Sequence, residues 1–349
     1  MMKHVHGGNI YDHRNCVDFS ANCNPLGTPE GVRKAVQDSL NCLDCYPQVG
    51  YLPLKKAIAD YEQCSADEII CGNGAAELIF SVCRACMPKK ALLAVPTFAE
   101  YEQALDSVNC QVRHYELSED RGFVLDRGFL KELTDDLDMV FLCNPNNPTG
   151  ILIPCELLKE ILQLCRKRGI FLVVDECFLD FVEDPQAHTL KSYLESFENL
   201  FLLKAFTKRY AMAGLRLGYG ITGNRALLEK MDRQVQPWNI SVPAQAAGIA
   251  ALSETEYVRQ GRRIVFEERK YLTKSLEEMG LKVLPSQANY LFFRAPEGFD
   301  KKCCERGILI RSCGNYAGLQ EGWYRIAVRT HEENRKLTEV FQEILKIRS

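Results

Sequence analysis

The sequence lacks any apolar run long enough to span a membrane, and its first residues lack the apolar core of a signal peptide. It also lacks a basic stripe, because 43 Lys and Arg are interspersed with 46 Asp and Glu and the formal net charge is -3. A protein that follows a phosphate backbone needs concentrated positive charge. We therefore expect no membrane and no nucleic-acid partner, and we expect a cytoplasmic location.

Cysteine, by contrast, is abundant, with 16 in 349 residues. Most lie inside apolar periodic segments, where a free Cys behaves as a small hydrophobe, so we expect no disulfide framework. Three close pairs occur: Cys42 and Cys45, Cys83 and Cys86, and Cys303 and Cys304. None of them is followed by the second-pair spacing of a structural zinc site, and we expect no metal.

Short apolar runs alternate with helical patterns from about residue 70 to 245. The runs are ALLAV (91–95), MVFLC (139–143), IFLVV (170–174) and NLFLL (199–203). Runs without alternation are typical of strands buried on both faces of a parallel sheet. Between two of them, PCELLKEILQLCRKRG predicts a helix that ends at Gly169. This βαβ repetition predicts an α/β domain with a mostly parallel central sheet.

The pattern changes beyond residue 280. Strands are expected in VLPSQANYLFF, GILIRSC and WYRIAVR, and Thr330 and Glu333 have the capping-box spacing that begins a final helix. These elements predict a smaller α+β domain.

No low-complexity linker separates the two predicted domains. We therefore expect their boundary within a long helix near residues 245–278. Residues 45–250 are expected to form the large domain. Residues 1–44 and 251–349 are expected to form the small domain with an N-terminal arm.

Polar residues follow three of the apolar runs: Asn147 in NPNNPTG, Asp175 in DE and Lys208 in TK. Ligands of open α/β sheets bind beyond the carboxyl ends of the strands. Each residue alone has an ordinary explanation, as a turn, a strand end or a solvated lysine. Together, an amine, a carboxylate and an amide are what a pyridine aldehyde cofactor needs, for covalent attachment, for its ring nitrogen and for its ring oxygen.

The chain resembles the class I and II aminotransferases, which are pyridoxal-phosphate enzymes of fold type I. Four motifs in the family's order carry the resemblance across nearly the whole chain: GNGAAELI (72–79), NPNNPTG (144–150), VVDE (173–176) and FTKRYAMAGLRLGY (206–219). The resemblance implies that Lys208 binds the cofactor covalently, that Asp175 pairs with its ring nitrogen and that Asn147 donates to its ring hydroxyl.

The resemblance also implies how the cofactor phosphate is held. Arg216 and Thr207 would contact it, together with backbone N–H groups of Gly74, Ala75 and Ala76 at a helix N-terminus.

Two aromatic residues complete the implied site. Phe98 in PTFAEY would stack on the cofactor ring, and Tyr46 in CYPQVGY would reach the phosphate from a neighbouring subunit, which implies a homodimer. Two positions depart from the family. Phe178 and Ala205 stand where many relatives have hydroxyl donors, which leaves Asn147 and Arg216 to hold the cofactor with help from Thr207.

Two N-terminal motifs, HGGNIY (6–11) and DFSANCNPLG (18–27), resemble a branch of the family that acts on phosphorylated amino substrates. The substrate contacts that this resemblance implies are His6, Gly7, Asn22, Asn147, Arg311 and Arg325. Arg325 would bind the α-carboxylate and Arg311 the phosphate, because planar guanidinium suits both anions.

The residues leave the reaction open between decarboxylation and transamination, since the outcome depends on which bond at Cα stands perpendicular to the cofactor ring. Two other classes are disfavoured. A transcription factor with this fold needs a helix-turn-helix ahead of the motifs, which begin near residue 6. A nicotinamide dehydrogenase needs GxGxxG after the first strand, and that motif is absent there.

Overall fold

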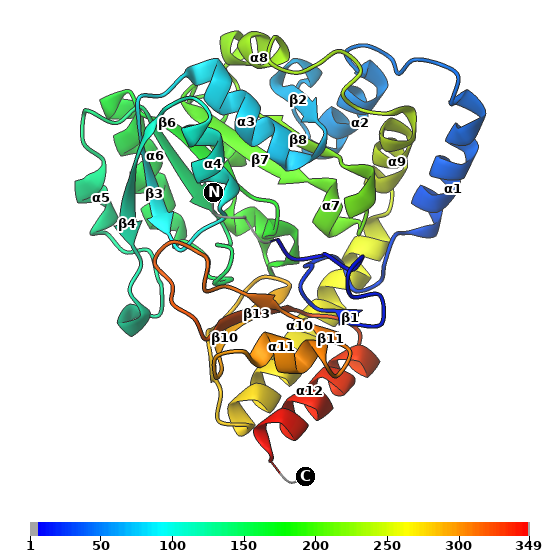
Figure 1. Ribbon diagram of the computed structural model, residues 1–349. Coiled ribbons are helices and arrows are strands. Elements are labelled where there is room, and N and C mark those ends of the chain that lie inside the picture. Colours follow the sequence, from blue (N-terminus) through cyan, green and yellow to red (C-terminus); the bar gives the residue numbers. More distant parts are fainter. Residues whose placement is uncertain (1–5, 348–349) are drawn as a thin grey trace.

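The computed structural model describes residues 6–347, which form two parts drawn one above the other in Figure 1. The upper part is built on a seven-stranded sheet, and the lower part holds a four-stranded and a two-stranded sheet. This confirms the predicted α/β fold with a mostly parallel central sheet and a smaller α+β part.

The large sheet consists of β2 (Ile69–Gly72), β3 (Lys90–Val95), β4 (Gln111–Glu116), β5 (Met139–Cys143), β6 (Phe171–Asp175), β7 (Leu200–Ala205) and β8 (Gly218–Ile221). Its strand order is β2-β8-β7-β6-β5-β3-β4, and β8 runs antiparallel to the other six strands. The four predicted apolar runs are confirmed as β3, β5, β6 and β7. The sequence QVRHYE of β4 is polar because this strand is the partly exposed edge, and the search for apolar runs missed it.

Helices cover both faces of the large sheet and bury two apolar clusters against it. They are α2 (Leu52–Glu62), α3 (Gly74–Cys86), α4 (Glu100–Asp106), α5 (Phe129–Glu132), α6 (Cys155–Arg168), α8 (Arg225–Asp232) and α9 (Val242–Leu252), with α7 (Phe206–Arg209) as a single turn. The predicted α6 is confirmed: it buries Leu157, Leu158, Ile161, Leu162 and Cys165 and ends at Gly169, whose φ is 69°.

The lower part is organised around the antiparallel sheet β12-β13-β10-β9. Its strands are β9 (Lys282–Val283), β10 (Tyr290–Arg294), β12 (Arg311–Ser312) and β13 (Trp323–Ala327), and its helices are α10 (Thr255–Glu278), α11 (Phe299–Cys304) and α12 (His331–Leu345). A third apolar cluster lies between them and includes Phe293, Phe299 and Phe341. The predicted capping box of Thr330 and Glu333 is present at the start of α12.

The N-terminal segment contacts both parts. Strand β1 (Val17–Asp18) pairs in parallel with β11 (Ile308–Leu309) of the lower part, whereas α1 (Glu30–Ser39) packs on α9 of the upper part. The division into 45–250 and 1–44 with 251–349 stays a prediction, and residues 1–5 and 348–349 of it lie outside the described residues.

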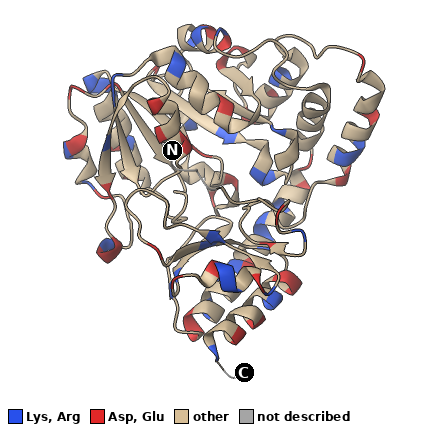
Figure 2. Ribbon diagram, viewed as in Figure 1, with Lys and Arg blue, Asp and Glu red and all other residues tan. Residues whose placement is uncertain are grey.

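Figure 2 shows that acidic and basic residues are interspersed over both parts. Within residues 6–347, no helix combines the length and the hydropathy that crossing a membrane requires.

Candidate active site

A cavity of about 370 Å³ lies where the carboxyl ends of β6 and β7 face β12, β13 and the N-terminal arm. It brings together residues that are up to 319 positions apart, from His6 to Arg325. The sequence-predicted residues that line it are His6, Gly7, Asn22, Ala75, Ala76, Phe98, Asn147, Asp175, Thr207, Lys208, Arg216, Arg311 and Arg325.

Asp175 is held rigidly at the floor of the cavity. Tyr101 Oη donates to its Oδ2 at 2.6 Å, and the Cys177 N–H donates to its Oδ1 at 2.9 Å. Burial raises the pKa of the Asp175 carboxyl, and the hydrogen bonds from Cys177 and Tyr101 and the nearby Lys208 charge counteract part of this rise. A protonated ring nitrogen would supply the positive partner that a buried carboxylate needs.

Tyr101 was missed by the sequence reasoning. It follows Phe98 by three residues in PTFAEY, so both lie on one side of the turn that begins α4, and their rings touch edge to face at 5.6 Å. That spacing was the signal that could have identified it.

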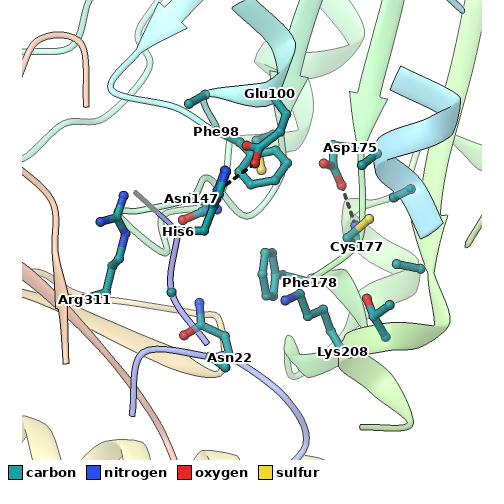
Figure 3. A pocket seen from close by; sticks show the side chains of 18 of the residues that line it. His6, Asn22, Phe98, Glu100, Asn147, Asp175, Cys177, Phe178, Lys208 and Arg311 are labelled. Atoms are coloured by element: carbon teal, nitrogen blue, oxygen red, sulfur yellow. Dashed lines mark hydrogen bonds and ion pairs between the residues drawn. The ribbon is translucent and has the colours of Figure 1, made fainter. Parts of the chain in front are cut away.

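Lys208 reaches the cavity because β7 passes directly into the short helix α7. Its Nζ lies 5.8 Å from the centre of the Phe178 ring. Figure 3 shows the two side chains next to each other. Phe178 and Ala205 both line the cavity, so the two positions where the family often has hydroxyl groups present only carbon atoms to it. Thr207 is the neighbouring hydroxyl that remains.

A cradle for an anion lies at the N-terminus of α3. Gly74 begins this helix with φ of 80°, and a Cβ there would stand 2.4 Å from Arg216 Nη2. Only glycine therefore allows the guanidinium to lie across the helix end. Ala75 and Ala76 line the cavity at the same place, where free N–H groups and the positive end of the helix dipole suit a phosphate.

Two arginines form the opposite wall. Arg311 and Arg325 are direct neighbours across the antiparallel pair of β12 and β13, and only 6% and 7% of their surface is exposed. Arg311 Nη2 donates to Asn315 Oδ1 at 2.9 Å, and Arg325 Nη2 donates to the carbonyl of Ser20 at 3.0 Å.

Asn147 lines the cavity next to Arg325. Arg325 Nη1 donates to its Oδ1, so the side-chain oxygen is already used. The Nδ2 group is therefore the part of Asn147 that can donate to a ring oxygen.

The N-terminal arm closes one side of the cavity. His6 Nδ1 lies 3.1 Å from Glu100 Oε1, and Gly7 fits so closely that a Cβ would stand 2.4 Å from the Ser20 carbonyl oxygen. Asn22 is 1% exposed, and its Oδ1 has no hydrogen-bond partner within residues 6–347. Other lining residues that the sequence reasoning missed are Ser20, Ala21, Ala99, Glu100, Cys143, Cys177, Asn315 and Tyr316.

Tyr46 lies outside this cavity. It is 79% exposed and its ring contacts that of Trp238 at 4.8 Å. Its predicted contact with a neighbouring subunit stays a prediction. Gly74 borders the cavity through Arg216 rather than lining it.

Two further cations near the end of β7 serve a different purpose. Lys204 lies 3.5 Å from Glu62 and 3.4 Å from Glu176, and Arg209 lies 2.9 Å from Asp180. Lys204 pairs with two buried acids, and Arg209 pairs with the partly buried Asp180.

The arrangement fits pyridoxal phosphate. An amine, a buried carboxylate, an amide donor and a glycine-shaped anion cradle surround one space. Asn22 Oδ1 and Arg325 Nε of the lining residues have no hydrogen-bond partner within residues 6–347, as is consistent with a site for a polar ligand. In the described part of the chain, no group of three or more His, Cys, Asp or Glu is arranged to hold a metal ion.

Comparisons with known proteins agree with this geometry. A family model described as aminotransferase class I and II matches residues 14–341. Threonine-phosphate decarboxylase of Salmonella typhimurium is 37% identical, over 98% of this chain and 96% of that protein. The adenosylcobalamin biosynthesis bifunctional protein CobDQ of Leptospira interrogans is 32% identical, over 97% of this chain and 41% of that protein. The solved structure of histidinol-phosphate aminotransferase from Clostridium acetobutylicum has a TM-score of 0.88 and 30% identity, and the match covers 94% of this chain and 98% of that one.

Proposed function

Because the chain belongs to the aminotransferase class I and II family and is a pyridoxal-phosphate-dependent enzyme, we propose that it decarboxylates L-threonine O-3-phosphate. The products are CO2 and (R)-1-amino-2-propanol O-2-phosphate. Full-length similarity to a threonine-phosphate decarboxylase supports the reaction, and similarity to an adenosylcobalamin biosynthesis protein supports a role in cobalamin biosynthesis.

The observation that carries this proposal is the pair of buried arginines on β12 and β13. The cradle of Arg216 and α3 accounts for the cofactor phosphate, so Arg311 and Arg325 remain for anions of the substrate. An amino acid phosphate has two such anions, a carboxylate and a phosphate. Bidentate guanidinium contacts suit both.

Three residues of the cavity have separate roles toward the cofactor. Pyridoxal phosphate, when bound, supplies a ring that accepts the electrons released when a bond at the substrate Cα breaks. Lys208 would hold it covalently, Asp175 would keep its ring nitrogen protonated, and Asn147 Nδ2 would donate to its ring oxygen.

The substrate side is oriented by the opposite wall. Arg325 binds the carboxylate and Arg311 the phosphate, while His6, Gly7 and Asn22 of the N-terminal segment border the bound molecule and exclude water. Lys208 Nζ is the group that takes or returns a proton in this space.

Histidinol-phosphate aminotransferase is the second candidate, favoured by the structural similarity to the Clostridium acetobutylicum enzyme. It needs the same cofactor residues and a phosphorylated substrate. It differs in requiring a 2-oxo acid as the acceptor of the amino group.

The test is incubation of the cofactor-loaded protein with L-threonine O-3-phosphate and no 2-oxo acid, with CO2 release as the measurement. Sustained CO2 release, over many turnovers per enzyme, is expected. If CO2 is absent and histidinol phosphate with 2-oxoglutarate yields glutamate instead, the aminotransferase is the correct assignment.

We also propose a homodimer. Large exposed apolar side chains gather in residues 40–52 and on the neighbouring α9 and Trp238: Leu40, Leu43, Tyr46, Val49, Leu52, Trp238 and Ile249. A patch of this kind is typical of a subunit interface, and it would carry Tyr46 toward the partner. Light scattering of the wild type and of Val49→Asp tests this, and a monomeric wild type would contradict it.

A cytoplasmic location is proposed from the cysteines. All sixteen are free in the structure, as is expected where thiols are kept reduced.

A further inference from the structure

Two thiols far apart in the sequence meet at the base of the N-terminal arm, where the arm (residues 6–16) joins β1. Cys16 Sγ lies 3.9 Å from Cys304 Sγ, and the residues are 288 positions apart. Both side chains are partly exposed, whereas the adjacent Cys303 is buried in the apolar cluster of the lower part. His13 Nδ1 lies 3.3 Å from Cys304 Sγ, so a base stands beside one thiol.

The backbone holds these groups in place. The Cys16 N–H donates to the His13 carbonyl at 2.9 Å, which closes a turn that brings His13 and Cys16 together. On the other side, the Gly307 N–H donates to the Cys304 carbonyl at 3.0 Å, and the Val17 N–H donates to the Gly307 carbonyl at 2.8 Å. Both thiols are therefore fixed relative to the pairing of β1 with β11.

We propose that Cys16 and Cys304 are a peroxide-reactive pair that closes to a disulfide and ties the base of the arm to α11. The Cys304 thiol gives its proton to His13, and its sulfur attacks hydrogen peroxide to form a sulfenic acid and one water. Cys16 then attacks that sulfur, which forms the S–S bond and releases a second water. Two thiols are oxidised while one peroxide is reduced to two waters, and a dithiol reductant reverses the change.

The geometry assigns the order of the steps. Cys304 contacts the base, whereas burial and the neighbouring Cys304 and Asp18 raise the pKa of the Cys16 thiol. The sulfur atoms need to approach by only about 2 Å to reach the bond length of about 2.05 Å. In a reducing compartment such a disulfide is transient and responds to oxidants.

The disulfide acts on the cavity through the arm. Cys16 is nine residues from Gly7, and both Gly7 and His6 of the arm line the cavity. Fixing its base leaves less conformational freedom to be lost when substrate binds. Oxidation is therefore expected to lower KM for a substrate that contacts the arm, an effect that rests on the proposed function, whereas disulfide formation does not.

The first experiment treats the cofactor-loaded protein with a small excess of hydrogen peroxide, followed by alkylation and peptide mass spectrometry. A linked peptide containing Cys16 and Cys304 is expected, with a loss of two free thiols that dithiothreitol restores. Cys16→Ser and Cys304→Ser each abolish this link. The exposed Cys42 and Cys45 form the matched control, and a Cys42→Ser, Cys45→Ser protein keeps the link.

His13→Gln should slow closure at least fivefold, because it removes the base. The proposal is overturned if Cys16 and Cys304 remain alkylatable while other cysteines oxidise, or if His13→Gln closes at the wild-type rate. KM for L-threonine O-3-phosphate is then expected to fall at least twofold on oxidation. An unchanged KM overturns the effect on the cavity, and a protein without decarboxylase activity still reports the disulfide through its peptides.

Discussion

Two charged regions lie near the carboxyl ends of β6 and β7, on the two faces of one sheet. They differ in whether their charges are paired with one another. One is the cavity, with Asp175 and Lys208. The other is a buried ion cluster of Glu62, Glu176, Lys191 and Lys204. Asp175 and Glu176 are consecutive, and Lys204 precedes Lys208 by four residues, so the same two motifs supply both regions.

Charges in the ion cluster satisfy one another. Glu62 contacts Lys191 at 3.0 Å and accepts from Tyr219 Oη at 2.6 Å, and Lys204 lies between Glu62 and Glu176. In the cavity, Lys208 forms no ion pair within residues 6–347. Removing one partner of a buried ion pair destabilises the fold because the other charge is left uncompensated, whereas an unpaired cation that faces open space can serve a ligand.

The strongest contrast is expected between the two lysines. Lys208→Ala removes the group that binds the cofactor and moves protons, so kcat should fall by roughly 10²- to 10⁴-fold or more while the fold persists. Lys204→Met leaves two buried carboxylates without their shared cation and should cost about 3–5 kcal/mol of unfolding free energy.

Steady-state assays and urea unfolding of both variants measure this contrast. If Lys208→Ala retained activity, or if Lys204→Met lost kcat without losing stability, the assignment of the two regions would be wrong.

The two consecutive acids provide the next contrast. Asp175→Asn removes the charge opposite the ring nitrogen and should lower kcat about 10²- to 10³-fold. Burial raises the pKa of Glu176, and Lys204 partly counters this rise. Because Glu176 lies 3.4 Å from Lys204 and is not among the residues that line the cavity, Glu176→Gln should alter kcat less than twofold. Cofactor absorbance and kcat are the measurements. An equal loss of kcat in both variants would contradict the assignment of Asp175 to the cavity and of Glu176 to the ion cluster.

Two tyrosines make a matched pair with smaller effects. Tyr101 donates to Asp175 and Tyr219 donates to Glu62, both at 2.6 Å. Tyr101→Phe should lower kcat about tenfold or more, because a hydrogen bond to a charged group contributes about 1.5–3 kcal/mol. Tyr219→Phe should lower unfolding free energy by a similar amount and leave kcat unchanged. If kcat fell in Tyr219→Phe, the ion cluster would contribute to catalysis, and the separation of the two regions would be wrong.

Acid should weaken the ion cluster gradually. Burial alone raises the pKa of Glu62, but Lys204, Tyr219 and Lys191 outweigh it and lower the pKa from 4.5 to about 2. A lowered pKa gives stability that is present above pH 4.5 and lost as the pH falls toward 2. The stability difference between wild type and Glu62→Gln should shrink by about 1 kcal/mol per pH unit from pH 4.5 to 3. A pH-independent difference would show that Glu62 is not charged in the folded protein.

Much of the cavity follows from the sequence because the predicted cofactor residues follow three strands, β5, β6 and β7, that are marked by apolar runs. Residue type alone could not separate Asp175 from Glu176 or Lys208 from Lys204. That separation depends on which face of the sheet each side chain takes, and on the turn from β7 into α7.

Other features depend on contacts between distant segments. The Tyr101 hydrogen bond to Asp175 spans 74 positions, and the approach of Cys16 to Cys304 spans 288. The edge strand β4 has the polar sequence that its exposed position allows, so no apolar run marked it.

The contacts of the N-terminal segment also impose an order in which parts of the structure can form during synthesis. The Phe19 carbonyl accepts from the Ala327 N–H at 2.7 Å, and the Ser20 carbonyl accepts from Arg325, 305 positions later in the chain. At a translation rate of roughly 5–20 residues per second, the first segment of the cavity waits about 15–60 s for its partner strand. The large sheet, whose strands end at Ile221, therefore has time to fold before β13 completes the substrate wall.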